Sequence, residues 1–444
     1  MLRRTFLQKT LAAAAVAPLI LPSRVLGRDA SAPAPSGLLQ VGVIGLGGQG
    51  RGVLGGFLDH PRVRVTALCD VDRNHLRQSA ERVDKHYASA ASASSSAAPA
   101  GPAGPAYQTT DFRDLLARDL DAVVIATPDH WHAIPVISAA RRGLHIYLEK
   151  PFALTIPEGR AMVRAIEQAG IVCQVGSQQR SSSEFQRVVE LARNGFFGRI
   201  SKVEVGLPGG KGDRPKMTAP LAPQTIPEEL DYDMWLGPAP AAPYYNERCH
   251  FHFRWISDYS GGQLSDWIGH HYDIASWALG VDHTGPVALH NAAATFHEDP
   301  LYDTVDKYAF AAHYAGGQVI QVSSSFRSGL RIEGDQGWAH VDRGVSEFSD
   351  ARLRRAPIPS QGFVIDRRNT WHTGNFIDGI LLGRPVICPP ETSHRAAAVA
   401  HLANIAFRTG RSTLRWDPAT ETILDAPDAA ARLCRAYRGP WTLV

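Results

Sequence analysis

A carboxylate and an imidazole four residues apart form the clearest acid–base pair in the chain. Asp266 and His270 lie in a segment, residues 261–279, whose apolar residues recur at helical spacing and predict a helix. This spacing would place the Asp266 carboxylate beside the His270 imidazole, where it could orient the ring and tune its basicity as a proton acceptor. Surface ion pairs often have the same spacing, so the pair alone does not establish a catalytic site.

A lysine stands where a predicted strand ends. Residues 145–148 form a short apolar strand, and Glu149, Lys150 and Pro151 follow it directly. The carboxyl ends of parallel strands line the ligand crevice of an open sheet. Lys150 would there meet both substrate hydroxyls and a nicotinamide ring, with Glu149 beside it. A surface lysine after a strand would look the same in so short a segment.

A glycine-rich loop opens the first predicted helix. Gly45, Leu46, Gly47, Gln49 and Gly50 follow a short apolar strand in the pattern Gly-x-Gly-x-x-Gly. The first glycine allows a tight turn, the second lets a pyrophosphate approach the backbone, and the third permits close packing of helix and strand. The free N–H groups of the helix N-terminus favour an anion. A glycine-rich turn without a ligand is the alternative.

An acid follows the loop at the distance typical of dinucleotide-binding domains. Asp70 lies twenty residues beyond Gly50, at the end of the next predicted strand. Its carboxylate would accept hydrogen bonds from ribose hydroxyls and repel a 2′-phosphate, which favours NAD over NADP. Arg73 is close enough in sequence to weaken that preference.

A third strand ends at the same edge in Thr127, Pro128 and, five residues after Thr127, His132. These residues are predicted to contact the cofactor. They could equally begin a helix, with proline in its first turn and Asp129 as a cap. Both interpretations can hold together, because the cap would lie where the cofactor binds.

Strands alternate with helices through residues 38–176, which predicts a doubly wound Rossmann domain. Residues 88–106 form a low-complexity insert and are predicted to be a solvated loop. After residue 176 the regular alternation of strands and helices gives way to hairpin-like segments. Residues 177–444 are therefore predicted to form a largely antiparallel α+β domain. The predicted elements are strands 41–46, 63–70, 121–127, 145–148, 171–176, 200–207, 307–314, 318–325 and 338–341, with helices at 74–87, 183–194, 371–382 and 393–408.

Residues 1–37 are predicted to be an export leader and linker. Arg3 and Arg4 precede a short apolar stretch, residues 11–21, in the form of a twin-arginine signal read by the export machinery. That stretch is too short to span a bilayer comfortably. The expected location is therefore periplasmic or otherwise extracytoplasmic. Cofactor lost there would not be replaced, so retention would require nanomolar affinity, about −12 kcal/mol.

Composition argues against other classes of function. A net charge of +3, with no basic run interleaved with aromatics, argues against nucleic-acid binding. The five scattered cysteines contain no Cys-x-x-Cys and do not indicate a disulfide framework. A metal site built from Cys249, His250, His252, His270 and His271 matches no zinc spacing, so no metal is predicted.

Several polar residues are predicted to face a polyhydroxylated substrate. His250 and Arg254 lie in a segment whose alternating aromatics, Phe251, Phe253 and Trp255, could be the buried face of a strand. Arg180 and His271 are assigned to the same substrate-binding set.

Taken together, these motifs resemble the Gfo/Idh/MocA family, named for glucose–fructose oxidoreductase, inositol dehydrogenase and rhizopine catabolism. The resemblance runs from Gln40 onward and rests on the glycine loop, the Thr-Pro and Glu-Lys-Pro motifs, and Gly-Gly-x-Leu-x-Asp266-x-x-x-His270. It implies a Rossmann domain followed by an α/β domain with an open antiparallel sheet, often paired between subunits, and hence a homo-oligomer. It also implies the catalytic set Lys150, Asp266 and His270.

The resemblance leads us to expect hydride transfer between a nicotinamide cofactor and a hydroxyl or ketone of a sugar or cyclitol. Trp267 and His271 replace residues that are smaller or aliphatic in the founding members. The Thr-His-Gly-Leu-Gly-Pro motif of exported NAD-dependent glycosidases is missing, which argues against a glycosidase without excluding one. Epimerisation by transient oxidation and a non-enzymatic nucleotide and sugar sensor are further alternatives.

Overall fold

The computed structural model describes residues 37–92, 104–210, 215–219, 221–368 and 371–443. The predicted leader, with Arg3 and Arg4, and most of the low-complexity insert lie outside the described residues. In the part of the chain that is described, no helix is long and apolar enough to cross a membrane.

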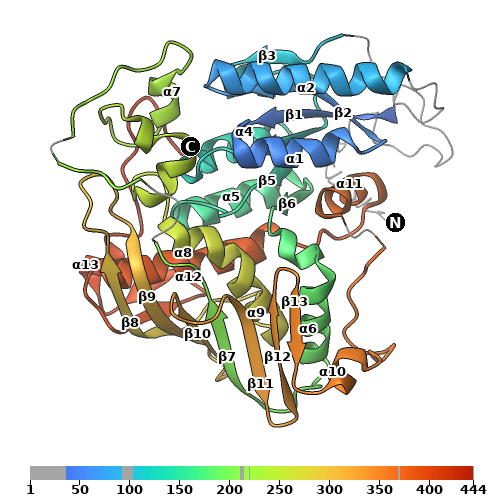
Figure 1. Cartoon of the computed structure of the whole chain (residues 1–444), viewed down its shortest axis with the longest axis vertical. Helices are drawn as coiled ribbons and strands as arrows, with labels where there is room; N and C mark the ends of the chain where they lie inside the picture. The colour runs from blue at the N-terminus through green and yellow to red at the C-terminus, as the bar shows by residue number, and fades with distance from the viewer. Residues whose placement is uncertain (1–36, 93–103, 211–214, 220, 369–370, 444) are drawn as a thin grey trace, which may run out of the picture.

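Six parallel strands form the first sheet, in the order β3-β2-β1-β4-β5-β6 (Figure 1). This is the predicted doubly wound order, which reverses between β1 and β4. The carboxyl ends of those two strands therefore flank the crevice in which such sheets bind ligands. The strands are β1 (Leu39–Ile44), β2 (Val63–Cys69), β3 (Tyr107–Thr109), β4 (Ala122–Ile125), β5 (His145–Leu148) and β6 (Cys173–Val175).

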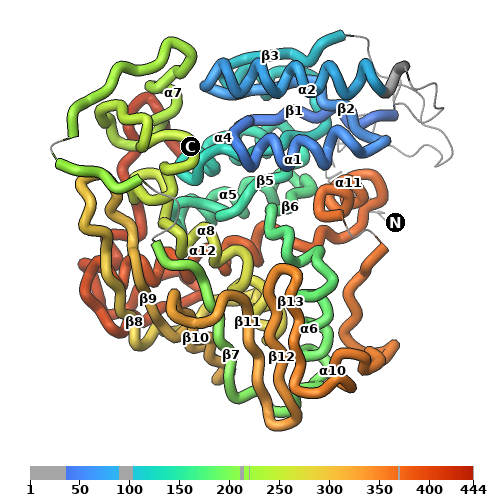
Figure 2. Tube along the Cα trace, viewed as in Figure 1, coloured from blue at the N-terminus to red at the C-terminus, as the bar shows by residue number. Residues whose placement is uncertain are grey.

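Helices cover both faces of this sheet, because its strands are apolar on both sides. One face carries α1 (Gly48–Leu58) and α2 (Arg73–Ser92), and the other carries α3 (Phe112–Leu116), α4 (Ala133–Arg141) and α5 (Ile156–Ala169). A late helix, α11 (His372–Leu382), also packs here, with Phe376 against Phe57 and Tyr147. Figure 2 shows this segment beside α1, although more than three hundred residues separate them.

The predicted loop over residues 88–106 is wrong at its beginning. Helix α2 continues to Ser92, five residues into the low-complexity segment. Alanine has the highest helix propensity of all residues, so an Ala/Ser run can extend a helix that is already nucleated. A lack of core-forming residues therefore does not by itself predict a loop.

Nine strands form the second sheet, in the order β13-β12-β11-β7-β10-β9-β8-β14-β15. All neighbours pair antiparallel except β7 and β10, which confirms the predicted, mainly antiparallel sheet. The strands are β7 (Ile200–Gly206), β8 (Ala288–Phe296), β9 (Val305–His313), β10 (Val319–Ser323), β11 (Gly329–Gly334), β12 (Gly337–Asp342), β13 (Val345–Phe348), β14 (Leu414–Asp417) and β15 (Thr422–Leu424).

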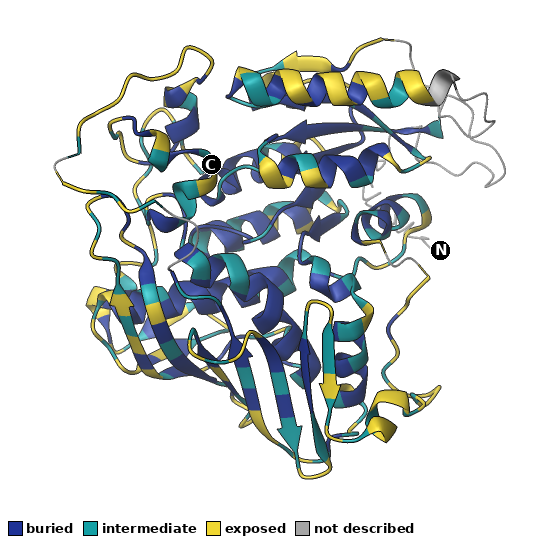
Figure 3. Ribbon diagram, in the orientation of Figure 1, coloured by how far each residue is buried: buried dark blue, intermediate teal, exposed yellow. Residues whose placement is uncertain are grey.

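A layer of helices packs on one face of this sheet and forms the larger core. Figure 3 shows these helices as mostly buried, whereas the outer face of α2 is exposed. They are α6 (Ser183–Arg193), α8 (Gly262–Trp267), the π-helical turn Ile268–Tyr272, α9 (Asp273–Leu279) and α12 (Pro390–Arg408). Of the short helices, α7 (Tyr232–Leu236) belongs to a separate apolar cluster, α10 (Ala351–Arg355) has no buried residue, and α13 (Pro427–Ala430) packs on this core through Ala429.

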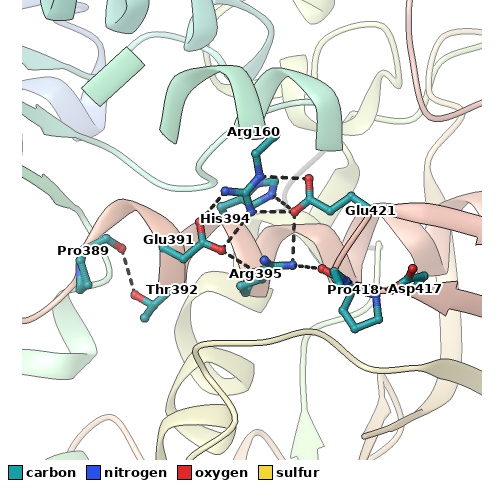
Figure 4. Close-up of polar contacts among 10 residues, drawn as sticks. Arg160, Pro389, Glu391, Thr392, His394, Arg395, Asp417, Pro418 and Glu421 are labelled. Carbon is teal, nitrogen blue, oxygen red and sulfur yellow. Dashed lines mark hydrogen bonds and ion pairs between the residues drawn. The ribbon is translucent and has the colours of Figure 1, made fainter. Parts of the chain in front are cut away.

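An ionic cluster joins the two parts of the molecule (Figure 4). Arg160 of α5 donates to both oxygens of Glu391 on α12, at 2.8 and 2.9 Å, and to both oxygens of Glu421, at 3.1 and 2.7 Å. Glu421 lies in the β14–β15 hairpin and also meets His394 at 2.7 Å. One guanidinium thus fastens a Rossmann helix to the second domain.

Candidate active site

The predicted lysine and aspartate meet where the two domains face each other. Lys150 follows β5, Asp266 lies on α8, and Lys150 Nζ donates to Asp266 Oδ1 at 2.6 Å. Both side chains are mostly buried, at 13% and 17% exposure. Although burial alone would raise the pKa of the Asp266 carboxyl, the charges of Lys150 and Arg254 lower it to about 2. The carboxylate is therefore ionised throughout the neutral range.

The Asp266 carboxylate was expected beside the His270 imidazole, and their charges do interact, but the described residues show no hydrogen bond between them. The Asp266 carboxylate accepts from Lys150. The helix changes from α to π at Ile268. A π turn has an i→i+5 pattern, so a four-residue spacing no longer stacks two side chains as it does in an α-helix. The prediction that Asp266 orients the imidazole is therefore wrong in this geometry.

His270 is nevertheless brought to the same place. Its side chain is buried, and its Nδ1 atom has no hydrogen-bond partner within the described chain. Burial, together with the charges of Lys150 and Arg343, holds the pKa of His270 well below its ordinary value. The imidazole is thus neutral and able to accept a proton.

Lys150, Asp266 and His270 line one cavity of about 520 Å³. Its volume falls within the range of ligand pockets, roughly 300 to 1,000 Å³. Both domains contribute to the wall. The other lining residues are Gln49, Gln178, Gln179, Ser182, Phe185, Arg254, Trp267, Arg343 and Gly344.

The glycine loop beside this cavity has the close approaches that its pattern predicts. Gly45 has a positive φ of 88°, and a Cβ atom at Gly50 would lie 2.0 Å from the Gly45 carbonyl oxygen. A Cβ at Gly47 would meet nothing within 4 Å, so the backbone is open where a pyrophosphate would approach. Leu46 N donates to Asp70 Oδ2 at 2.6 Å, which ties the loop to the predicted ribose acid.

Unsatisfied polar atoms mark the rest of this edge. Thr127 Oγ1 and Glu149 Oε2 are buried without a partner among the described residues. The other Glu149 oxygen accepts from Gln178 Nε2 at 2.7 Å, and burial raises the pKa of Glu149. Buried polar atoms in proteins are normally hydrogen-bonded. These atoms and the open loop therefore fit a bound dinucleotide.

His132 does not face a ligand as predicted. Its two ring nitrogens lie 2.8 Å from the Pro151 carbonyl oxygen and 2.9 Å from that of Thr127. The side chain is only 1% exposed. His132 therefore joins the two loops at the strand edge. Pro128 caps the short 3-10 turn Asp129–Trp131 and contributes to the same edge through the backbone.

Two residues assigned to substrate binding are structural. Arg180 is 2% exposed and donates to both oxygens of Asp273, at 2.6 and 2.8 Å, and to Asp282 at 3.1 Å. His271 has no exposed surface, its Nε2 lies 3.4 Å from Asp342 Oδ1, and burial lowers its pKa to about 4. Neither residue lines the cavity. Arg180 faces α9, and His271 lies between Phe185 of α6 and Asp342 of β12.

His250 also lies outside the cavity, while Arg254 lines it. The segment forms a 3-10 helix, His250–Trp255, and not the strand considered from its alternating aromatics. His250 Nε2 lies 3.5 Å from Asp72 Oδ2, and its ring packs on His75. These three are the one group in the described chain whose ligand atoms are close enough for a metal, and they differ from the five residues considered from the sequence.

Arg343 was not identified from the sequence, and Asp129 was considered only as a helix cap, a position that Pro128 occupies. Arg343 lies in the β12–β13 turn, with its guanidinium 4.7 Å from the centre of the Trp267 ring. Asp129 is buried, and burial raises its pKa to about 7, with the charge of Asp266 acting in the same direction. No local motif marks Arg343, because only the folding of a distant hairpin brings it to the cavity.

Two family models match consecutive parts of the chain. One, described as the NAD-binding Rossmann fold of an oxidoreductase family, matches residues 39–177. The other, described as the C-terminal alpha/beta domain of the same family, matches residues 183–443.

Relatives with similar sequences match over part of their length. A "Glycosyl hydrolase family 109 protein" of Saccharopolyspora erythraea is 32% identical over 165 residues, which is 36% of this chain and 33% of that protein. The "Uncharacterized oxidoreductase YrbE" of Bacillus subtilis is 27% identical over 35% of this chain and 40% of its own length. The chain thus matches less than half the length of these relatives.

Solved structures share the fold over most of the chain. GenD2 from gentamicin A biosynthesis, solved with NAD, is 20% identical with a TM-score of 0.61, covering 88% of this chain and all of that one. The aldose–aldose oxidoreductase of Caulobacter crescentus, solved with glycerol, is 20% identical with a TM-score of 0.60, covering 85% and 99%. These likenesses establish the architecture.

Proposed function

The chain belongs to the Gfo/Idh/MocA oxidoreductase family, and we propose that it transfers a hydride between a tightly held nicotinamide cofactor and a hydroxyl or ketone of a sugar or cyclitol. One observation carries the proposal. Lys150, Asp266 and His270 line a single cavity beside the glycine loop, and they come from both domains.

His270 acts as the proton acceptor for the substrate hydroxyl. A bound nicotinamide supplies the hydride acceptor that no side chain provides. The ring of His270 is neutral because burial and neighbouring cations depress its pKa. Its charged form is less costly near the Asp266 carboxylate, whose charge favours a proton on His270.

Lys150 stabilises the oxygen that loses its proton. Its ammonium group reaches the cavity while it donates to Asp266 at 2.6 Å. An ammonium has three donors, so the other two are available for a developing alkoxide. Asp266 holds that ammonium in place, which is a different role from the imidazole orientation expected from the spacing.

Substitution of the two reacting groups tests this assignment. His270→Ala and Lys150→Ala should each lower kcat by about 100-fold or more, because each removes a proton acceptor or an oxyanion donor. His283→Ala and Lys85→Ala are matched controls at exposed positions outside the cavity. The measurement is the single-turnover rate at which the bound nicotinamide is reduced, followed by its absorbance after mixing with a sugar that the parent oxidises. Near-parental turnover in both cavity variants would refute the roles.

Export is part of the proposal and gives it a second test. A protein outside the cytoplasm meets no nicotinamide pool, so a closed redox cycle is expected in which the same site reduces and reoxidises its cofactor. The purified protein should therefore carry NAD, released on denaturation and identified by mass spectrometry. Protein without nucleotide that turns over with freely added NAD would contradict tight retention.

A second candidate function is glycoside cleavage or epimerisation through transient oxidation. It is favoured by the relatives named for glycosyl hydrolase family 109, which share 30–32% identity over part of the chain. Release of nitrophenol from nitrophenyl glycosides would identify glycoside cleavage, and conversion of one sugar into its epimer would identify epimerisation. Cofactor that never changes redox state with any sugar would favour a sensor instead.

A further inference from the structure

The candidate cavity carries an excess of positive charge. Its charged lining residues are three cations, Lys150, Arg254 and Arg343, and one carboxylate, Asp266. The shortest contact of that carboxylate is to Lys150, at 2.6 Å, whereas Arg254 Nη2 lies 3.8 Å from the same oxygen. Among the lining residues, Asp266 thus pairs with Lys150 and Arg254, whereas Arg343 has no ion pair in the described chain.

Arg254 has unused hydrogen-bonding capacity. Its side chain is 18% exposed, and its Nε atom is buried with no partner among the described residues. Its one hydrogen bond, at 3.3 Å, goes to the Phe251 carbonyl oxygen. A buried guanidinium N–H without a partner is costly, and a ligand oxygen would satisfy it.

Arg343 supplies a second guanidinium and, unlike Arg254, has no carboxylate partner among the described residues. It stacks on Trp267 at 4.7 Å. Its Nε lies 3.1 Å from the Gln179 side-chain amide. The stacking holds the planar group at the cavity wall, where its fork of donors matches a carboxylate or phosphate.

These arginines are not placed for the cofactor phosphates. The pyrophosphate is expected at the open backbone of Gly47 and the start of α1. Arg254 and Arg343 instead belong to the second domain and lie beside Asp266 and Trp267. Their charges therefore face the substrate side of the cavity.

We propose that the substrate is an anionic sugar, carrying a carboxylate or a phosphate that Arg343 and Arg254 bind. This inference rests on the proposed function and specifies its substrate class. An anion bound between these groups would also counter the cationic charges that depress the basicity of His270. Binding of the correct substrate would then make the proton acceptor a stronger base.

The test compares matched sugars on the full-length holoenzyme. Glucose and galactose are the neutral arm, glucuronate and galacturonate the carboxylate arm, and glucose 6-phosphate the phosphate arm. Titration calorimetry on the His270→Ala holoenzyme measures the affinity for each sugar without turnover. The absorbance of the bound nicotinamide measures the reaction in the parent. At least one anionic sugar should bind ten-fold or more tighter than its neutral counterpart.

Variants at Arg343 identify the group responsible. Arg343→Gln should weaken the anionic sugar about ten-fold and the neutral sugar less than two-fold, and Arg343→Lys should retain part of the preference. Arg352→Gln, which removes the same charge at a 92% exposed position, should change neither affinity. The preferred arm then distinguishes carboxylate from phosphate.

The outcomes separate this inference from the proposed function. Neutral sugars that bind as tightly as anions, or equal losses for both in Arg343→Gln, would overturn the anionic assignment even if hydride transfer occurs. Arg343-dependent binding of an anion with no redox change for any sugar would support the assignment and overturn hydride transfer.

Discussion

At the residue scale, the site depends on an ion pair between two domains. Lys150 and Asp266 are 116 residues apart, yet their side chains meet at 2.6 Å in a mostly buried position. Loss of one partner leaves the other as a buried charge without compensation, which costs more than the pair itself contributes. The pair is therefore expected to affect stability as well as turnover.

Asp266→Asn should destabilise the protein by about 3 kcal/mol, since the amide still accepts a hydrogen bond but no longer balances the ammonium charge. Urea unfolding of parent and variant measures the difference. Glu204→Gln is the matched control, because Lys202 and Glu204 form a similarly short lysine–carboxylate contact, at 2.9 Å, with a 43% exposed lysine. Equal losses in the two variants would show that burial of the Lys150 pair has no special cost.

At the element scale, two local contacts hold helices in position: the close packing in the glycine loop that begins α1, and the ionic cluster that holds α5 against α12. Each depends on a few atoms in close contact, and a substitution there cannot be absorbed by movement elsewhere in the fold. Each also has a counterpart elsewhere in the chain that lacks the requirement, which makes matched substitutions possible.

Gly50→Ala should abolish tight cofactor retention, because its Cβ would lie 2.0 Å from the Gly45 carbonyl oxygen and neither backbone can move freely. Gly52→Ala lies one half-turn further along the same helix and would meet nothing within 4 Å. It should instead stabilise α1 by about 0.5–1 kcal/mol through the higher helix propensity of alanine. Nucleotide content after denaturation and the thermal midpoint report both effects. Full nucleotide content in Gly50→Ala would contradict the close packing at the loop.

The Arg160 cluster should make the free energy of unfolding fall as the pH is lowered. Burial alone would raise the pKa of Glu421, but His394 and Arg160 lower it to about 2. Since the folded pKa lies below the ordinary value, the contribution to stability is complete above about pH 4.5 and is lost as the pH falls toward 2. Glu421→Gln should therefore be destabilising at pH 7 and show a smaller loss of stability between pH 5 and pH 3.

Glu347→Gln provides the comparison for this pH dependence. Glu347 also forms two hydrogen bonds with an arginine, Arg327, both at 2.7 Å, but the pair lies on the exposed surface. Solvent screening makes such pairs weak, so this variant should follow the parent at every pH. Urea unfolding at each pH gives both curves, and identical curves for the two variants would exclude a stabilising role for the cluster.

At the scale of the whole molecule, periodicity predicted the type of both sheets and the strands that are apolar on both faces or alternate regularly, but it missed some strands. The strands without a prediction are β3 in the first sheet and β8, β11, β13, β14 and β15 in the second. The same reasoning located Lys150 at a strand end and His270 on a helix. It could not predict that a π turn separates Asp266 from His270, since that depends on packing. Nor could it distinguish Arg254, which lines the cavity, from Arg180, which is buried against Asp273, because the two arginines differ only in their tertiary partners.

Because the cavity is lined by both domains and lies beside the glycine loop, cofactor binding should stabilise the whole chain and distinguish NAD from NADP. Asp70 accepts from Leu46 N and Asp72 N and holds its charge beside the loop, where a 2′-phosphate would be repelled. Protein freed of nucleotide and returned to NAD at a hundred times its Kd should gain about 2.7 kcal/mol. NADP at the same concentration should give a clearly smaller gain, and Asp70→Asn should narrow the difference. Equal thermal shifts with the two dinucleotides in the parent would show that Asp70 does not select the cofactor.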